Sequence, residues 1–346
     1  MRIALDAMGG DRAPAAPVEG ALAAISAYPD VEVLLVGDPA VLERELVVRG
    51  GRPDRMTIVP SDGVVGMDEE PVRAMKAKPK NSARVAAELL GSGGADGVVN
   101  LGSTGAAVAA ATLFCKRIVG VSRLGIAVPF PRRSGVTIVV DCGANVDVRP
   151  EHLYVYAVMA RHYCRVAVGT PSPKVGLLSI GEEEHKGNKL VKEVWELFRR
   201  HPLEGFVGNV EGRDVFRDTA DVVVCDGFVG NVLLTAAEGL GELCIGIVKD
   251  ALPTVPGAAA ILKDLVKKFD YAEYGGAPLL GVRGTYIIGH GRSDGRAVKN
   301  AIRVVRELIA GGVDTRIAAE LATTPGLGTP APGAPPSGTP PSGAAS

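Results

Sequence analysis

The sequence predicts an α/β protein built on a mainly parallel, doubly wound sheet. Two observations support this class: short β-branched segments alternate with helical segments, and one strand after another ends in an acidic, amide or glycine residue. Glycine and alanine are abundant whereas aromatic residues make up only 4% of the chain, which favours close packing of helices on a sheet. The 346 residues are enough for one large domain of this kind.

The first half of the chain predicts four strands and four helices in alternation. The strands are expected at residues 3–5, 31–36, 57–59 and 98–101, and the helices at residues 14–27, 39–48, 81–90 and 106–113. Residues 67–80 interrupt this order because they are polar, proline-punctuated and alternately acidic and basic. They predict a substrate-facing loop around one helical turn, or equally a solvated surface segment.

The second half repeats the pattern. Strands are expected at residues 124–129, 136–140, 174–180 and 286–288 and at the beginnings of segments 206–212 and 222–231, and helices at residues 151–163, 189–199 and 296–309. We predict one domain over residues 1–322, with an amphipathic helical segment at about residues 240–269 that is broken at Pro253 and Pro256. Residues 323–346 are almost entirely Pro, Gly, Ser, Ala and Thr, and we expect this tail to be disordered.

Composition excludes several classes of protein. The formal net charge of −1 argues against a dedicated nucleic-acid binder, which needs a strong basic excess. The five cysteines are scattered without a C-x-x-C pair, which indicates reduced thiols in a cytoplasmic protein; Cys142 and Cys225 end apolar runs and are expected to be small buried residues. Every long apolar run has polar interruptions, so we expect no membrane-spanning segment.

A glycine-rich turn is the strongest single candidate for a binding site. Gly102, Ser103, Thr104 and Gly105 connect the strand at residues 98–101 to an alanine-rich helix. Strand, tight turn and helix in this order direct unpaired backbone N–H groups to one place, where phosphate is a favoured ligand. The alternative is a turn that needs its glycines only for backbone angles. The sequence contains neither G-x-x-x-x-G-K-[ST] nor G-x-G-x-x-G.

Polar residues at the ends of other strands are further candidates. Asp6 precedes a second glycine turn that contains Gly9 and Gly10. The carboxyl edge of an open α/β sheet is where ligands bind, so polar side chains delivered there can line a site. The candidates of the second half are Asp141, Asn145, Asp226 and Asn231.

Two histidines and a lysine can bind an anion, polarise a carbonyl or move a proton. His185 and Lys186 lie in a polar turn, and His290 lies between two glycines. The alternatives are an exposed loop residue for His185 and a hydrogen-bonded turn histidine for His290. Neither an H-E-x-x-H sequence nor a cysteine pair offers a zinc site, and we predict no metal.

Two helical segments carry contact surfaces. In residues 258–269 an apolar face is flanked by lysines, which predicts a dimer or core contact, with a membrane-surface contact as the alternative. The apolar residues are Ile261, Leu262, Leu265, Val266 and Phe269, and the lysines are Lys263, Lys267 and Lys268. On the later helix four cations predict a solvated face or a contact with an acidic protein partner: Arg296, Lys299, Arg303 and Arg306.

Six sequence features follow one another in a specific order. They read DAMGGD at residues 6–11, GSTG at 102–105, DCGANVD at 141–147, GEEEHKGN at 181–188, GNVEG at 208–212 with CDGFVGN at 225–231, and YGGAPLLG at 274–281. Together they resemble the bacterial phosphate acyltransferases of the PlsX family, and the resemblance covers about residues 1–310. The chain departs from the family pattern at Arg12, Ser103 and His185.

This resemblance implies transfer of a fatty acyl group from acyl-[acyl carrier protein] to inorganic phosphate, which yields acyl phosphate for phospholipid synthesis. It implies a homodimer with a three-layer α/β/α fold related to isocitrate and isopropylmalate dehydrogenases and to phosphate acetyltransferases. It also implies a cytoplasmic enzyme at the inner face of the membrane that passes acyl phosphate to the glycerol-3-phosphate acyltransferase PlsY. No cofactor is implied.

The same resemblance suggests roles for the candidate residues. Residues 102–105 would hold phosphate, and Lys186 or His185 would neutralise the phosphate or the oxyanion. Asn231 and His290 would orient the thioester. Further substrate-binding candidates, some of which frame the pocket, are Asp6, Gly9, Gly10, Asp141, Asn145 and Asp226. The four cations of the later helix would contact the carrier protein.

Two other functions compete with this one. A decarboxylating dehydrogenase of the same fold would use NAD and a metal, and would need a nucleotide site and clustered aspartates that the sequence does not show. A peripheral lipid-binding scaffold without enzymatic activity would rest on residues 258–269 alone.

Overall fold

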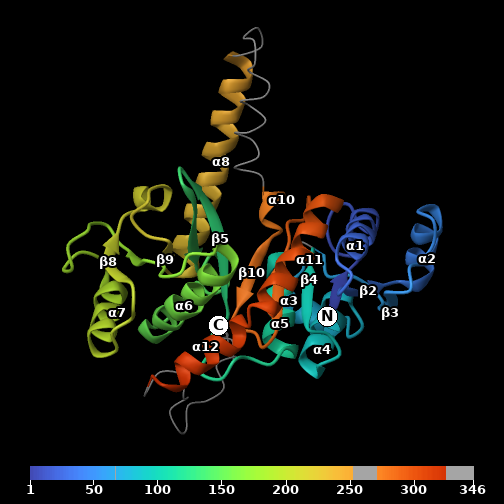
Figure 1. Cartoon of the computed structure of the whole chain (residues 1–346), viewed down its shortest axis with the longest axis horizontal. Coiled ribbons are helices and arrows are strands. Elements are labelled where there is room, and N and C mark those ends of the chain that lie inside the picture. Colours follow the sequence, from blue (N-terminus) through green and yellow to red (C-terminus); the bar gives the residue numbers. More distant parts are fainter. Residues whose placement is uncertain (67, 252–270, 325–346) are drawn as a thin grey trace, which may run out of the picture.

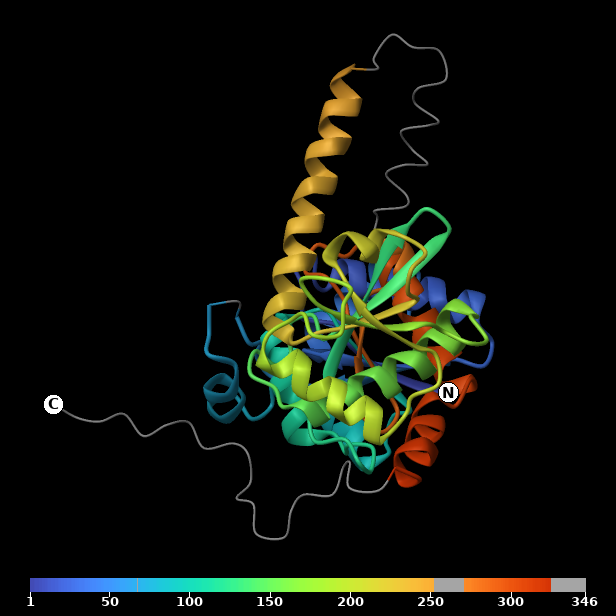
Figure 2. The ribbon, with the colours of Figure 1, turned by 90° about the vertical axis from the view of Figure 1, so that its left-hand side faces the viewer.

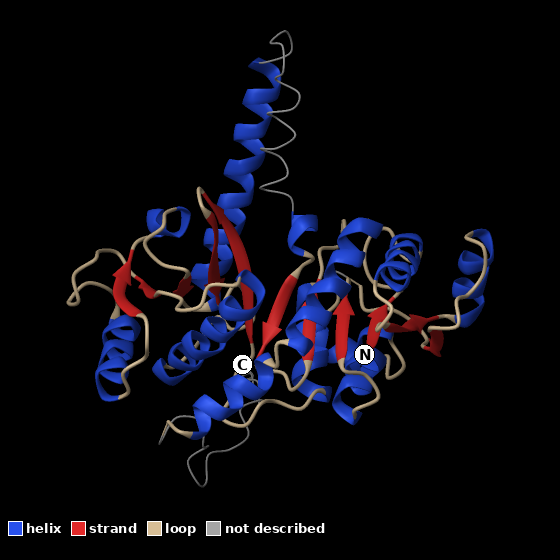
Figure 3. Cartoon of the chain, in the orientation of Figure 1, coloured by secondary structure: helices blue, strands red, loops and turns tan. Residues whose placement is uncertain are grey.

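The computed structural model describes residues 1–66, 68–251 and 271–324, and the strands of these residues form one eleven-stranded sheet. Its strand order is β3-β2-β1-β4-β11-β10-β5-β6-β9-β7-β8. Helices lie on both faces of the sheet (Figure 1, Figure 3). Seven strand pairings are parallel and three are antiparallel, which confirms the prediction of a mainly parallel sheet.

The first half of the sheet is parallel throughout, and its strands and helices confirm the predicted alternation. The strands are β1 (Arg2–Asp6), β2 (Glu32–Gly37), β3 (Met56–Pro60), β4 (Gly97–Asn100) and β11 (Thr285–Ile288). The helices are α1 (Ala15–Ala27), α2 (Pro39–Val48), α3 (Pro71–Ala77), α4 (Ser82–Ser92), α5 (Thr104–Phe114) and α11 (Gly295–Ala310). The polar segment at residues 67–80, expected as a loop around one helical turn, contains the short helix α3.

Side-chain caps explain where several helices begin. Asp38 accepts two backbone N–H groups at the start of α2. The side chains of Asn81, Ser103 and Asp294 cap α4, α5 and α11 in the same way. Because such caps are local in sequence, the starts of these helices agree with the prediction to within two residues.

Three antiparallel pairings separate the two parallel halves of the sheet. β10 (Ala277–Leu280) lies between β11 and β5 (Gly125–Arg132), and β5 forms a hairpin with β6 (Gly135–Val140). The sequence does not predict β10, because Pro278 and the adjacent glycines interrupt the strand pattern. Its partner β11 follows it closely in the chain, whereas its partner β5 is far away in the chain and is brought beside it by the tertiary fold.

The second half of the sheet is again parallel and is covered by fewer helices. Its strands are β6, β7 (Val175–Leu178), β8 (Phe206–Val210) and β9 (Val222–Val224). Its helices are α6 (Pro150–Tyr163), the π-helix η1 (Cys164–Val168), α7 (Lys189–Arg200) and the 3-10 helix η2 (Gly212–Phe216). The short helix α10 (Tyr271–Tyr274) precedes β10.

The helix α8 (Gly227–Ala251) projects from the body of the protein (Figure 2). It begins at Gly227 rather than near residue 240, because Asp226 accepts the N–H of Val229 at 2.9 Å and so caps the helix directly after β9. By length and apolar composition alone, residues Gly227–Asp250 could cross a membrane, and the expectation that no segment spans one stays a prediction. The predicted contact residues between 261 and 269 lie outside the described residues.

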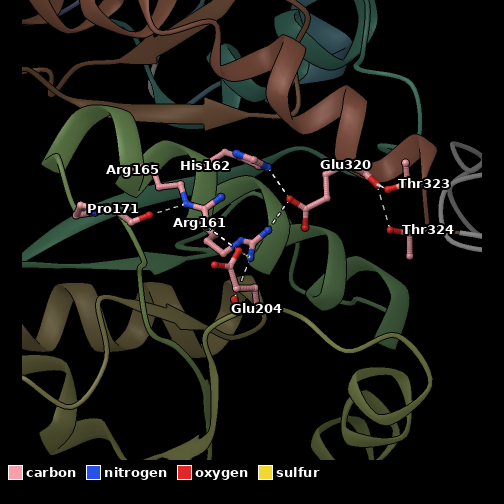
Figure 4. Close-up of polar contacts among 8 residues, drawn as sticks. All are labelled: Arg161, His162, Arg165, Pro171, Glu204, Glu320, Thr323 and Thr324. Carbon is pink, nitrogen blue, oxygen red and sulfur yellow. Dashed lines mark hydrogen bonds and ion pairs between the residues drawn. The ribbon is translucent and has the colours of Figure 1, made fainter.

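A helix that the sequence does not predict, α12 (Val313–Ala322), docks on α6 through buried charges (Figure 4). Glu320 Oε2 lies 2.5 Å from Arg161 Nη2 and 2.7 Å from His162 Nε2, and Arg161 is only 4% exposed. Burial raises the pKa of Glu320, but these two partners outweigh it and hold the pKa below its ordinary value. The last described helix is therefore anchored to the second half of the sheet.

Candidate active site

Three turns meet at the carboxyl edge of β1, β4 and β11, which are neighbours in the sheet. A Cβ built on Gly10 would lie 3.1 Å from the carbonyl oxygens of both Leu101 and Gly291. A Cβ built on Gly9 would lie 2.6 Å from the backbone nitrogen of Gly102, so no larger residue fits there. We call these turns, at residues 8–12, 101–105 and 289–293, the first turn cluster.

The glycine-rich turn of this cluster directs free N–H groups outward. Ser103 caps α5, with its hydroxyl accepting the N–H of Ala106 at 3.2 Å. The N–H groups of Thr104 and Gly105 have no acceptor among the described residues, and both residues are exposed. At the start of an eleven-residue helix these groups favour an anion. The turn has the geometry that a phosphate site needs, and contact with phosphate stays a prediction.

Asp6 supports the first turn cluster from inside the protein. Its side chain is 1% exposed, and its Oδ1 accepts the N–H groups of Met8 and Gly9, each at 3.1 Å. Burial raises the pKa of Asp6, while the Ser82 hydroxyl and these two N–H groups lower it. The carboxyl group holds the turn that follows β1, and its direct contact with a substrate stays a prediction.

His290 lies at the exposed rim of the first turn cluster. Its Nδ1 accepts the N–H of Arg292 at 3.1 Å, which leaves Nε2 to carry the proton of the neutral ring. Arg12 and Arg292 are exposed on the same turns. His290 is thus a hydrogen-bonded turn histidine that is also exposed, and its role toward a substrate stays a prediction.

The predicted polar residues of the second half gather around Asp141. Its buried carboxyl group accepts the N–H groups of Ile126 and Ala144 at 3.0 Å, and the N–H and the side-chain amide of Asn145 at 2.8 and 3.2 Å. Burial raises the pKa of Asp141, and these hydrogen bonds oppose the rise. We call the turns at residues 141–147, 181–188 and 225–231 the second turn cluster.

Two further predicted residues, Asp226 and Asn231, belong to the second turn cluster together with Asn145. The side-chain amide of Asn145 also donates to Tyr156 Oη at 2.8 Å, and Asp226 caps α8. Asn231 is exposed, and its Oδ1 would lie 3.2 Å from a Cβ built on Gly143, so it faces the turn after β6. Asn145 and Asp226 support the backbone, whereas Asn231 is available to a ligand.

The turn that carries Lys186 is held by a residue that the sequence does not single out. The side-chain amide of Asn209 donates to the carbonyl oxygen of Glu183 at 2.8 Å and accepts the indole N–H of Trp195 at 2.8 Å. Lys186 is half-buried, whereas His185 is exposed. The position of Asn209 at the end of β8 is the signal that could have identified it, because it matches the other strand-end amides.

The cysteines near the second turn cluster are unsuited to nucleophilic attack. Cys142 and Cys225 are buried, as predicted. Burial raises the pKa of both thiols well above the ordinary value, and neighbouring negative groups raise it further. The attacking group must therefore come from elsewhere.

One group of acidic residues has the spacing of a metal site. Oxygens of Glu182, Glu211 and Asp214 lie within 4.8 Å of one another. The guanidinium group of Arg213 contacts Glu211 and lies 3.8 Å from Glu182. The positive charge of Arg213 thus offsets part of the negative charge of this group.

The cations of α11 are less available than the sequence suggests, since three of the four form ion pairs within the chain. Arg296 pairs with Glu273, Arg303 with Glu307, and Arg306 with Asp30. Lys299 has no ion-pair partner among residues 1–66, 68–251 and 271–324. A contact of this face with a carrier protein stays a prediction.

Comparison with known proteins gives one consistent result. A family model described as "Fatty acid synthesis protein" matches residues 1–316. The chain is 47% identical to the phosphate acyltransferase of Desulfitobacterium hafniense (strain DSM 10664 / DCB-2), covering 93% of this chain and 98% of that protein. It is 44% identical to the phosphate acyltransferase of Desulforamulus reducens, covering 94% and 99%.

Solved structures share the fold at low sequence identity. A phosphotransacetylase from Streptococcus pyogenes aligns with a TM-score of 0.58 at 16% identity, covering 92% of this chain and 94% of that one. A branched-chain phosphotransacylase from Enterococcus faecalis V583 aligns with a TM-score of 0.56 at 15% identity, covering 89% and 99%. These similarities concern the fold alone; the predicted relation to isocitrate and isopropylmalate dehydrogenases is not tested by them.

Proposed function

The chain belongs to the phosphate acyltransferase family, and from this premise we propose that it transfers a fatty acyl group from acyl-[acyl carrier protein] to inorganic phosphate. A phosphate oxygen attacks the thioester carbon, and the bond from this carbon to the carrier's sulfur breaks. The products are acyl phosphate, which enters phosphatidic acid synthesis, and the free carrier protein.

The observation that carries this proposal is the pair of open N–H groups on Thr104 and Gly105. They can hold a phosphate ion by two oxygens while a third oxygen remains free to attack. Bound in this way, phosphate needs no side-chain nucleophile, in agreement with the raised pKa of the buried thiols of Cys142 and Cys225.

The second turn cluster supplies groups for the other substrate. Lys186, with His185 beside it, would stabilise the negative charge that develops on the thioester oxygen, and Asn231, together with His290 of the first turn cluster, would orient the thioester. The arrowheads of β4 and β8 point toward the side from which α8 projects (Figure 3), and we place the substrates on that side.

Replacing Thr104 with proline tests the phosphate site. Proline fits the first helical position, and Ser103 before it already has φ −61° and ψ 140°. Thr104→Pro removes one N–H and keeps the helix, whereas the control Thr104→Ala keeps the N–H. We expect the KM for phosphate to rise about tenfold in Thr104→Pro only, because a hydrogen bond to a charged group is lost. An unchanged KM would contradict the site.

A single assay separates this function from its two competitors. Acyl-carrier protein and phosphate are mixed with the enzyme, with and without NAD or a divalent metal, and the loss of thioester is followed. We expect phosphate-dependent loss without any addition. Activity that requires NAD and metal would support the dehydrogenase, and no turnover would support the lipid-binding scaffold.

The exposed face of α8 supports a homodimer. Val229, Val232, Leu240, Leu243 and Ile247 recur at helical spacing and are between 39% and 60% exposed. Pairing of two α8 helices would cover this stripe. Sedimentation at micromolar concentration should give the mass of a dimer, and a monomer would contradict the proposal.

We also propose a cytoplasmic enzyme bound peripherally to the inner face of the membrane, where PlsY would consume its product. The enzyme should cosediment with vesicles that contain anionic lipids, and its absence from the pellet would contradict this proposal.

Lys299 is our candidate on α11 for a contact with the carrier protein, because it has no ion-pair partner among the described residues. Lys299→Glu should raise the KM for acyl-carrier protein and leave the KM for phosphate unchanged.

A further inference from the structure

Three polar side chains form a buried row beneath the glycine-rich turn. Asp6, Asn100 and Tyr286 belong to the adjacent strands β1, β4 and β11 and are 1%, 0% and 1% exposed. Ala4, Val98 and Tyr286 are neighbours in the parallel register, and alternate residues of a strand share a face. The three polar side chains therefore lie on one face of the sheet, which α4 and α5 cover.

Asn100 connects this row to two turns of the first turn cluster. Its side-chain Oδ1 accepts the N–H of Gly102 at 2.9 Å, and its backbone oxygen accepts the N–H of Gly289 at 2.8 Å. Its side chain also interacts with the buried Tyr286 hydroxyl and opposes the rise that burial gives the pKa of that group.

The hydrogen bond from the N–H of Gly102 to Asn100 Oδ1 connects Asn100 to the proposed phosphate site. A Cβ built on Gly102 would lie 3.3 Å from Asn100 Oδ1 and 3.9 Å from Asp6 Oδ2, so the turn rests on both side chains. An asparagine that accepts the N–H two residues later fixes the backbone angles of the turn between them. The next residues are Ser103, which caps α5, and Thr104, whose N–H is open.

We propose that Asn100 is a positioning residue for phosphate: its side chain turns the N–H of Gly102 inward and thereby aims the N–H groups of Thr104 and Gly105 at the anion. Asn100 does not touch phosphate, because it is fully buried. This inference rests on the phosphate site proposed above. Phosphate affinity thus depends on a side chain beneath the turn as well as on the turn itself.

The variants Asn100→Thr and Asn100→Val form a matched pair that tests this role. They have nearly the same shape, but only threonine has a hydroxyl that can accept the N–H two residues later. We expect the KM for phosphate to be about tenfold higher in Asn100→Val than in Asn100→Thr, as one hydrogen bond allows, with similar KM values for the acyl donor. Tyr286→Phe, which changes the same buried row without touching Gly102, should leave the KM for phosphate unchanged.

Equal phosphate KM values in the threonine and valine variants would overturn the proposal, as would an equal rise in the KM of both substrates, which indicates a structural role. Where turnover is too low to measure, the rise in unfolding temperature caused by inorganic phosphate should persist in Asn100→Thr and be lost in Asn100→Val. The proposal is also overturned if Asn100→Val does not fold whereas Asn100→Thr does. Unchanged phosphate binding in Thr104→Pro refutes the phosphate site itself. If phosphate binding is weakened in Thr104→Pro but is the same in Asn100→Thr and Asn100→Val, only the positioning role of Asn100 is refuted.

Discussion

Both turn clusters contain buried side chains at the ends of strands, but these side chains have different roles in the two clusters. In the first, Asp6 and Asn100 each hold the turn that follows their strand, and the first N–H groups of α5 remain open. In the second, Asp141 accepts four hydrogen bonds, and Asp226 caps α8. The first cluster thus presents backbone donors to an anion, whereas the second presents side chains from a fully hydrogen-bonded frame.

This difference shows that one local sequence pattern serves two purposes. In both clusters a strand ends in an acid or an amide and is followed by glycines. The helices α5 and α8, which follow β4 and β9, differ in the charge of their caps, although α11 of the first cluster also has an acidic cap, Asp294. A carboxylate such as Asp226 already neutralises the helix start and repels a second anion, whereas the hydroxyl of Ser103 does not.

The largest expected effect concerns a half-buried side chain of the second turn cluster, Lys186. Lys186→Ala should lower kcat/KM about 100-fold, because it removes a cation that stabilises charge in the transition state. Lys189→Ala is the control, since Lys189 is 89% exposed and contacts only Glu193 at 3.6 Å. Steady-state kinetics with acyl-carrier protein and phosphate measure both variants. Near wild-type turnover in Lys186→Ala would assign catalysis to the first cluster alone.

A smaller effect should distinguish the two buried acids. Asp141→Asn should lower the free energy of unfolding by about 2–3 kcal/mol, because both carboxylate oxygens accept N–H groups and an amide offers one oxygen only. Asp6→Asn should lower the free energy of unfolding by less, because both backbone N–H groups donate to its Oδ1, and asparagine keeps this oxygen. Urea denaturation of both variants checks this order, and equal losses would remove the contrast between the clusters.

The smallest effect should come from α12, which lies outside both clusters. Glu320→Gln should lower the free energy of unfolding by about 1 kcal/mol at neutral pH through the lost charge, without changing the KM for phosphate. The pKa of Glu320 is lowered from 4.5, so the carboxylate stabilises the fold above pH 4.5 and loses this contribution as pH falls through the lowered value.

Melting curves of wild type and Glu320→Gln should therefore converge below pH 4.5. Glu204→Gln is the control, because Glu204 contacts the same Arg161 but is exposed, and its effect should be smaller. A difference between wild type and Glu320→Gln that persists unchanged at low pH would show that the ion pair contributes nothing.

The sequence by itself determined the features that depend on neighbouring residues. Hydrophobic periodicity and caps such as Asp38 and Ser103 predicted most helices and strands, because these signals act within one turn or one strand. The glycine-rich turn between β4 and α5 was predicted for the same reason. Its open N–H groups follow from the local order of strand, turn and helix.

Only the tertiary structure decided which polar residues face a ligand and which support the fold. The sequence presents Asp141, Asn231 and Lys186 in the same way, as polar residues in turns that follow strands. Asp141 is nevertheless buried, Lys186 half-buried and Asn231 exposed, because burial depends on strands that pair across the whole chain. The same kind of long-range contact paired β10 with β5, docked α12 through Arg161, and buried Asn100 by placing β4 between β1 and β11. Sequence patterns report local geometry, whereas the partner of a side chain is set by residues far away in the chain.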